Sequence, residues 1–95
     1  APPPAASAAR RQTLGGVLRL TAWCPDGCRV KAEAIDRATG RRLGMTSTRL
    51  GADERRRLRI RLLSRPRGKR IALRVTFSAL GSATERRTLH VSLRR

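Results

Sequence analysis

Aromatic residues are almost absent from this chain. Its 95 residues include one Trp, one Phe and no Tyr. Proteins that bind single-stranded nucleic acid stack successive bases on exposed aromatic rings, whereas Phe77 lies in an alternating apolar pattern typical of a core position. No stacking platform is therefore expected, and any nucleic acid would be bound through its phosphates, without sequence preference.

Long apolar runs and catalytic motifs are also missing. No stretch approaches the roughly 18 apolar residues of a membrane-spanning helix, and no basic segment followed by a hydrophobic one marks a signal peptide. The sequence has no paired carboxylates, no glycine-rich phosphate loop and no Ser, His and Asp in an order that hydrolases use. It thus predicts no membrane span, no enzyme and no bound cofactor.

Acidic residues are few. Six Asp and Glu stand against 23 Lys and Arg, so the formal net charge is +17, and only Lys31 and Lys69 are lysines. A field of this sign attracts polyanions such as nucleic acid, anionic lipid or an acidic cell-wall polymer. An Arg- and Ala-rich chain is also typical of a GC-rich genome, in which arginine fills exposed positions. A basic surface that is only solvated is therefore the alternative.

Chain length and N-terminal composition indicate one folded domain with an arm. Ninety-five residues lie within the size of a single core, roughly 50–200 residues. The chain begins with APPPAASAA, and segments rich in Pro are extended and semi-rigid. We expect residues 1–11 to form a disordered arm or linker and residues 12–95 to form the domain.

The chain has many segments in which apolar and polar residues alternate. Leu58, Ile60 and Leu62, for example, alternate with arginines. Strict alternation is typical of half-buried strands in an antiparallel sheet. Six segments show this pattern, the third more weakly than the others: Val17–Cys24, Cys28–Asp36, Arg42–Leu50, Arg57–Leu62, Arg70–Ser78 and Thr88–Leu93.

Turn-forming residues separate these segments, at 25–27, 38–40, 51–54, 64–69 and 80–83. Short strands with regular Gly and Pro punctuation predict an all-β fold. Residues 51–63 have a competing helical interpretation, because Asp53 and Glu54 suit a first helical turn, but their alternation favours a strand. The predicted fold is an antiparallel, immunoglobulin-like sandwich of two sheets with six strands, or seven if Gln12–Gly15 adds an edge.

Cys24 and Cys28 are the only cysteines, and they flank the turn Pro25-Asp26-Gly27. Both fall on the apolar register of their segments, so at the neck of a β-hairpin their side chains would point the same way, at a separation compatible with a disulfide. A zinc site needs four ligands, and the chain offers two thiols and the distant His90. A thioredoxin-like redox site uses C-x-x-C before a helix. The spacing favours a disulfide over free thiols and predicts no metal.

Three motifs carry a family resemblance: Cys24-Pro25-Asp26-Gly27-Cys28, Thr39-Gly40-Arg41-Arg42-Leu43-Gly44 and Arg57-Leu58-Arg59-Ile60-Arg61-Leu62. With the alternating strands, they resemble those of immunoglobulin-like or fibronectin-type-III-like β-sandwich modules in secreted and cell-surface proteins of actinobacteria. The resemblance covers most of residues 16–95. It implies a non-catalytic extracellular spacer or adhesion module. The inter-sheet cysteine pair that brackets a core Trp in antibody domains is not expected here, so antibody-like binding loops are not implied.

Arg55, Arg57, Arg59 and Arg61 are the candidate polyanion-binding residues. On one face of a strand they recur at about 6.6–7 Å, near the spacing of phosphates along an extended nucleic-acid strand, and guanidinium groups hold phosphates bidentately. We expect Arg74 to widen this patch from a strand of the same sheet.

Trp23 lies on the register opposite to Cys24. We expect it either to cap the end of the domain beneath the N-terminal arm or to form a contact with a partner.

Together these patterns predict a secreted or cell-surface structural module, because cytosolic thiols are kept reduced and a disulfide indicates export. Its partners would be an anionic wall polymer, or protein neighbours and further copies added through sheet edges or the N-terminal arm. The alternative is a cytosolic, sequence-independent nucleic-acid-binding protein that uses the arginines at 55–61.

Overall fold

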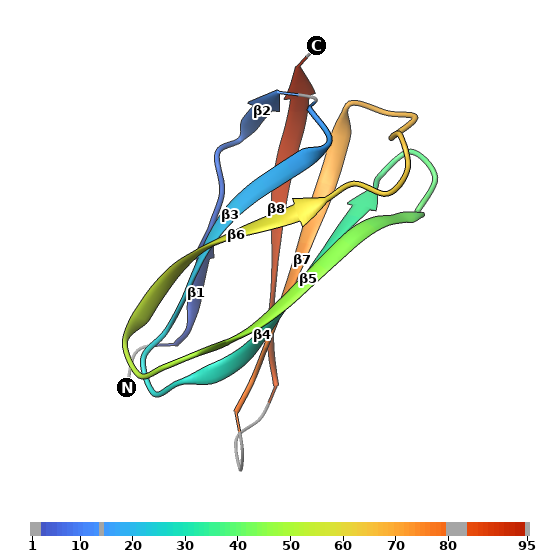
Figure 1. Ribbon diagram of the computed structural model, residues 1–95. Coiled ribbons are helices and arrows are strands. Elements are labelled where there is room, and N and C mark those ends of the chain that lie inside the picture. Colours follow the sequence, from blue (N-terminus) through green and yellow to red (C-terminus); the bar gives the residue numbers. More distant parts are fainter. Residues whose placement is uncertain (1–2, 14, 80–83, 95) are drawn as a thin grey trace.

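The computed structural model describes residues 3–13, 15–79 and 84–94, and within these ranges the chain forms strands and no helix. The strands build one three-stranded and one five-stranded sheet (Figure 1). Their bounds are β1 Ala5–Ser7, β2 Arg11–Thr13, β3 Val17–Cys24, β4 Cys28–Asp36, β5 Arg42–Leu50, β6 Glu54–Arg61, β7 Arg70–Ser78 and β8 Glu85–Arg94. The all-β prediction is confirmed.

The sheets have the orders β1-β3-β6 and β2-β8-β7-β4-β5. All neighbouring strands are antiparallel except β2 and β8, which are parallel. The segment for which a helix was the alternative forms β6. The predicted turn at 80–83 lies outside the described residues. No helix in the described ranges is long and apolar enough to cross a bilayer.

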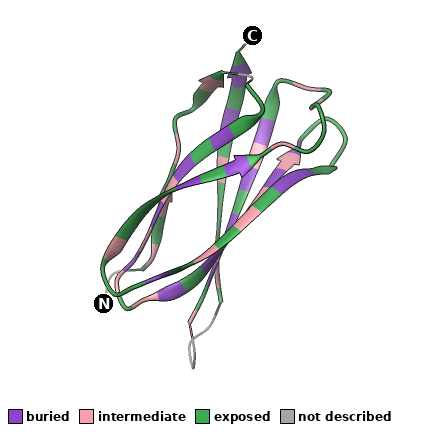
Figure 2. Cartoon of the chain, in the orientation of Figure 1, coloured by how far each residue is buried: buried purple, intermediate pink, exposed green. Residues whose placement is uncertain are grey.

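Alternation along each strand places one row of side chains in a core shared by the two sheets (Figure 2). From β6 this row includes Leu58 and Ile60, and from β7 it includes Leu73 and Val75. Burying an aliphatic side chain of this kind contributes about 1.5–3 kcal/mol. The opposite row is exposed to water and is largely arginine in β6, so the same period that builds the core also builds the charged face.

The chain turns between sheets at Pro25-Asp26-Gly27. β3 pairs with β1 and β6, whereas β4 pairs with β5 and β7, so the predicted β-hairpin at the cysteines is wrong. Pro25-Asp26-Gly27 makes a corner that carries the chain from one sheet to the other, and Gly27 adopts the left-handed region with a φ of 80°. A short turn with Pro and Gly suits either connection, because the turn residues do not determine which strands pair.

The N-terminal segment differs from the expected arm, because it contributes a short strand to each sheet. Ala5–Ser7 pairs with Thr21–Trp23 of β3, and Arg11–Thr13 pairs with the end of β8. Gln12 joins the two sheets: its side-chain amide donates to the carbonyl oxygen of Arg19 and accepts from the Arg19 backbone N–H, both at 2.8 Å. The pairing of β1 with β3 ends at Thr21, and beyond this point the Gln12 side chain forms the hydrogen bonds that a neighbouring strand would otherwise form with Arg19.

β5 approaches β6 closely at one end. A side chain on Gly44 would overlap the carbonyl oxygen of Arg61 and would lie 3.2 Å from a methyl carbon of Ile60. Next to it, the backbone N–H of Leu63 donates to the carbonyl oxygen of Leu43 at 2.8 Å. Only glycine permits this approach, which draws the edge of the five-stranded sheet against the three-stranded one.

Asp36, 1% exposed, is the buried charged residue of the described chain. Its carboxylate accepts backbone N–H groups from Ala38 at 3.0 Å and from Arg67 at 2.8 Å. Burial by itself would raise the pKa of Asp36, but these two hydrogen bonds, with others from Gly68 and Thr39, lower it below its ordinary value. The carboxylate therefore ties together the loops that follow β4 and β6.

Candidate polyanion-binding face

The four arginines at alternate positions of β6 all point away from the core. Arg55, Arg57, Arg59 and Arg61 are exposed, whereas Leu58 and Ile60 between them are buried. The strand therefore presents a row of guanidinium groups on the outer face of the three-stranded sheet, as the alternation predicts.

β3 adds a fifth cation that the sequence reasoning missed. Arg19 lies directly opposite Arg59 in the antiparallel register, and Thr21 lies opposite Arg57. Like charges directly opposite each other destabilise a sheet by an amount on the order of 0.2–1 kcal/mol. Alternation shows that Arg19 is exposed, but only the pairing of β3 with β6 reveals which residue faces it.

We call Arg19, Arg55, Arg57, Arg59 and Arg61 the arginine face. Among the described residues, the ion pairs join Glu33, Glu54 and Glu85 to other cations, and none includes a member of this face. The outward positions of β3 and β6 carry no acidic residue at all. The five positive charges are therefore not neutralised within the described chain.

Arg74 does not widen this face, contrary to the prediction. It lies on β7, in the five-stranded sheet, opposite Glu33 and Thr88. The expectation failed because alternation gives the exposed face of a strand but not the sheet to which the strand belongs.

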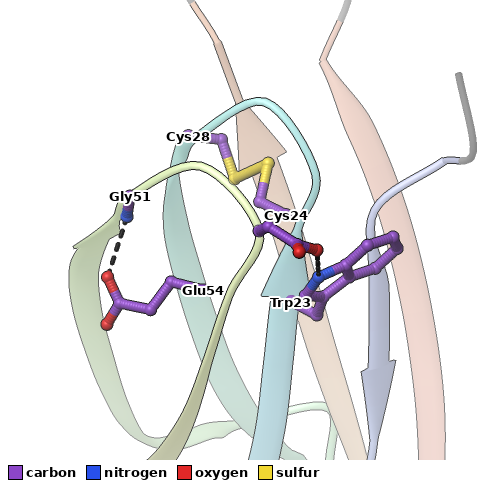
Figure 3. Close-up of a disulfide and its surroundings, with 6 residues drawn as sticks. Trp23, Cys24, Cys28, Gly51 and Glu54 are labelled. Carbon is purple, nitrogen blue, oxygen red and sulfur yellow. Dashed lines mark hydrogen bonds between the residues drawn. A yellow bond between two sulfur atoms is a disulfide. The ribbon is translucent and has the colours of Figure 1, made fainter.

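Trp23 lies at one end of the arginine face. Its indole N–H donates to a carboxylate oxygen of Asp53 at 2.8 Å (Figure 3), and the Arg55 guanidinium carbon lies 5.8 Å from the ring centroid. Ala5 is its register neighbour in β1. The ring is partly exposed. The Arg55 guanidinium lies against its face, and the hydrogen bond to Asp53 holds its edge. Contact of Trp23 with a partner stays a prediction.

The disulfide between Cys24 and Cys28 joins the two sheets beside this ring (Figure 3). Both cysteines are buried, as their register predicts. The turn that precedes β6 packs on this corner, where the Asp53 backbone N–H donates to the carbonyl oxygens of Cys24 and Pro25 at 3.0 and 2.9 Å. Asp53 has a φ of 59°, a left-handed conformation in which Asp is enriched.

Glu54 fixes the start of β6. Its carboxylate accepts the Gly51 backbone N–H at 2.9 Å and the Arg56 Nε–H at 2.8 Å. These interactions lower the pKa of Glu54, the Gly51 hydrogen bond most. Arg56 is the one cation of β6 that is neutralised, and it also donates to the Thr48 hydroxyl at 2.7 Å. The disulfide corner, the turn and Glu54 together position the first arginines of the face.

An open groove of about 800 Å³ lies at the other end of the face. One wall is the segment that crosses between the sheets, including Ser7, Ala8 and Ala9. The rest of the lining is Gln12, Thr13, Gly15, Val17, Arg19, Leu20, Thr21, Arg57, Leu58 and Arg59. Three members of the arginine face therefore share this groove with hydroxyl and small apolar side chains.

The outer face of the five-stranded sheet is also basic. Arg29 and Arg49 lie directly opposite each other across β4 and β5. Glu33, by contrast, forms ion pairs with Lys31 at 4.0 Å and with Arg42 at 3.4 Å. This face is thus partly neutralised in its middle.

His, Cys, Asp and Glu side chains do not gather in groups of three that could hold a metal ion anywhere in the described ranges. Comparison of the sequence with known proteins found no match to a family model and no match to a curated protein.

Proposed function

We propose that this chain is an exported, non-catalytic, immunoglobulin-like β-sandwich module that attaches to a linear anionic polymer of the cell surface through its arginine face. One observation carries the proposal: the outward face of the paired strands β3 and β6 carries five exposed arginines and no acidic residue. An isolated module gains nothing from this arrangement, since opposed like charges cost stability. A bound polyanion removes that cost.

The strand order supports the immunoglobulin-like assignment. In immunoglobulin domains the first, second and fifth strands share one sheet, and the third, sixth and seventh share the other, which a further strand after the third can extend. Here β1, β3 and β6 form one sheet, while β4, β7 and β8 form the other with β5 beside β4. The switch of the N-terminal segment from β3 to β8 agrees with this arrangement.

The disulfide supports export. Thiols in the cytosol are kept reduced, and stable disulfides are typical of secreted and surface proteins. Cys24 and Cys28 are bonded and buried at a corner of the fold. Outside the cell, the accessible polyanions are surface polymers, and this favours them over nucleic acid as the partner.

The geometry of the arginine face supports a linear ligand. Alternate residues of a strand lie about 6.6–7 Å apart, so the four arginines of β6 form a row along which successive anionic groups of one polymer can bind. Guanidinium groups bind phosphate and carboxylate in a bidentate manner. With Arg19 beside Arg59, the row is widened at one end.

The proposal is tested by titrating the protein with long-chain polyphosphate at several salt concentrations. For a single-stranded polyanion, log K falls with log salt by about 0.7 for each cation engaged, so five arginines predict a slope of about −3.5. Arg57→Gln with Arg59→Gln should make the slope shallower by about 1.4. The matched control, Arg74→Gln with Arg86→Gln on the other sheet, should leave it nearly unchanged.

Equal effects of the two double variants would reject the arginine face as the binding surface. Duplex DNA in the same salt series tests the nucleic-acid alternative. Tight binding of DNA at 200 mM salt, together with free thiols in protein from its native source, would favour that alternative over an exported module.

A further inference from the structure

We infer that the groove at the end of the arginine face binds the phosphate or sulfate ester of a sugar unit. The inference deepens the proposed function, on which it rests, by naming the chemical group that the polymer presents at one position. Three arginines of the face, Arg19, Arg57 and Arg59, are among the residues that line the groove. Its volume, about 800 Å³, lies in the range of small-molecule sites, roughly 300–1,000 Å³.

The cations of the groove fit a tetrahedral anion. Arg19 and Arg59 face each other directly across the two strands, and Arg57 is two residues from Arg59 on the same face. A carboxylate offers two oxygens, whereas a phosphate or sulfate ester offers three, one for each guanidinium. Charge-assisted hydrogen bonds from guanidinium to an anionic oxygen are about twice as strong as those between neutral groups. The ester would also relieve the repulsion between Arg19 and Arg59.

The other lining residues fit a sugar ring. Ser7 and Thr21 are register neighbours in β1 and β3 and both line the groove, and each supplies a hydroxyl group of the kind that exchanges hydrogen bonds with sugar hydroxyls. Ala8 and Ala9 form a small apolar wall, and Val17, 36% exposed, lies near it. Small apolar surfaces of this kind can pack against the apolar face of a pyranose.

Gln12 holds the two walls of the groove in place. Its amide is bonded at 2.8 Å to both backbone groups of Arg19 and lies 3.3 Å from the carbonyl oxygen of Ala9. The wall that contains Ala8 and Ala9 is thereby fixed to the strand that carries Arg19 before any ligand arrives. A preformed site of this kind loses less conformational entropy on binding.

The test titrates isotope-labelled protein with glucose 6-phosphate, glucose 6-sulfate, glucuronate and glucose and follows amide chemical shifts by NMR. We expect saturable shifts at Arg19, Thr21, Arg57 and Arg59 with either ester, weaker shifts with glucuronate, and none with glucose at the same concentrations. Arg19→Gln should weaken ester binding about tenfold. The matched control is Arg29→Gln, which removes one arginine of the opposed pair on the other sheet and should change binding less than twofold.

Three outcomes would overturn the inference: glucuronate that binds as tightly as the esters, shifts that do not saturate, or equal losses from Arg19→Gln and Arg29→Gln. Binding of either ester supports it, and the tighter one identifies the ester. A parallel titration with long-chain polyphosphate distinguishes failure of the groove inference from failure of the proposed function. Ester binding without polymer binding contradicts only the proposed function, and polymer binding without ester binding contradicts only the groove.

Discussion

Cys24 and Cys28 are four residues apart in the chain, and their disulfide, with Cα atoms 6.1 Å apart, joins two different sheets. Replacing both by Ser should cost about 2 kcal/mol of unfolding free energy by the chain-entropy relation for so short a loop. The loss should be greatest locally, because Asp53 is hydrogen-bonded to the backbone of this corner. Urea unfolding and amide exchange measure the two effects. The prediction would be contradicted if reduction of the disulfide in the wild-type protein changed neither its urea unfolding nor the amide exchange rate of Asp53.

The opposition of Arg19 and Arg59 predicts that Arg59→Thr stabilises the fold. Removing one of two facing like charges should raise the unfolding free energy by about 0.5 kcal/mol at low salt. The gain should vanish at 1 M salt, because the charges are then screened. Arg61→Thr is the control, since Arg61 faces Val17, and it should give no comparable gain. Thermal melts in both salts provide the measurement, and a gain independent of salt would refute the electrostatic cause.

Asp36 predicts acid-dependent stability. Its folded pKa lies below the ordinary value of 3.8, so its carboxylate stabilises the fold above the unfolded pKa, about 3.9, and this stabilisation is lost as the pH falls through the folded pKa. Asp36→Asn should therefore destabilise the protein by about 1–3 kcal/mol at pH 7. The difference in unfolding free energy between the wild type and Asp36→Asn should become smaller below about pH 4.

Urea unfolding of wild type and Asp36→Asn between pH 2 and pH 7 checks this. Glu54 also has a lowered pKa, but it is present in both proteins, so their difference isolates Asp36. A gap that stays constant down to pH 2 would show that the charge of Asp36 is not the cause.

We expect even a methyl group at position 44 to destabilise the fold strongly. In Gly44→Ala the added Cβ would overlap the carbonyl oxygen of Arg61, and backbone must move to admit it, so we expect a loss of about 3 kcal/mol. Gly15→Ala serves as the control, because nothing lies within 4 Å of a Cβ there, and its effect should stay within about 0.5 kcal/mol. Denaturant midpoints of the two variants give the comparison. Similar midpoints would mean that β5 does not approach β6 this closely in solution.

Gln12 predicts a local loosening of the groove wall. Gln12→Ala removes two solvent-exposed hydrogen bonds to the backbone of Arg19, with a cost of about 0.5–1.5 kcal/mol, and should speed amide exchange at Arg19. Thr13→Ala, on the same short strand, should not. Hydrogen exchange followed by NMR measures both, and equal protection of the Arg19 amide in the two variants would rule out this role for Gln12.

The strands could be predicted from the sequence because apolar and polar residues alternate along a segment that is buried on one face only. The expected bounds Val17–Cys24, Cys28–Asp36, Arg42–Leu50 and Arg70–Ser78 are those of β3, β4, β5 and β7. The exposed row of β6 and the buried cysteines followed from the same period.

The pairing of strands could not be predicted in this way. A period of two shows which side chains share a face of a strand, whereas the neighbour of each strand depends on contacts between distant residues. Arg74 was therefore placed in the wrong sheet, and Arg19 was not matched with Arg59. The strand at Ala5–Ser7 was missed because backbone pairing to β3 holds it, and small side chains in a Pro- and Ala-rich segment leave no alternating pattern.

The parallel pairing of β2 with β8 also determines how the fold would carry a mechanical load. The molecule is elongated, with a longest extent of 39 Å, and β1 begins near one end while β8 finishes near the other (Figure 1). A pull on Ala5 and Arg94 along this axis drives β2 and β8 past each other. Because the hydrogen bonds of a parallel ladder are evenly spaced and all join the same two strands, those between Arg11–Thr13 and Ser92–Arg94 would be loaded together, in shear. A short parallel ladder thus makes the module resist stretching between its ends.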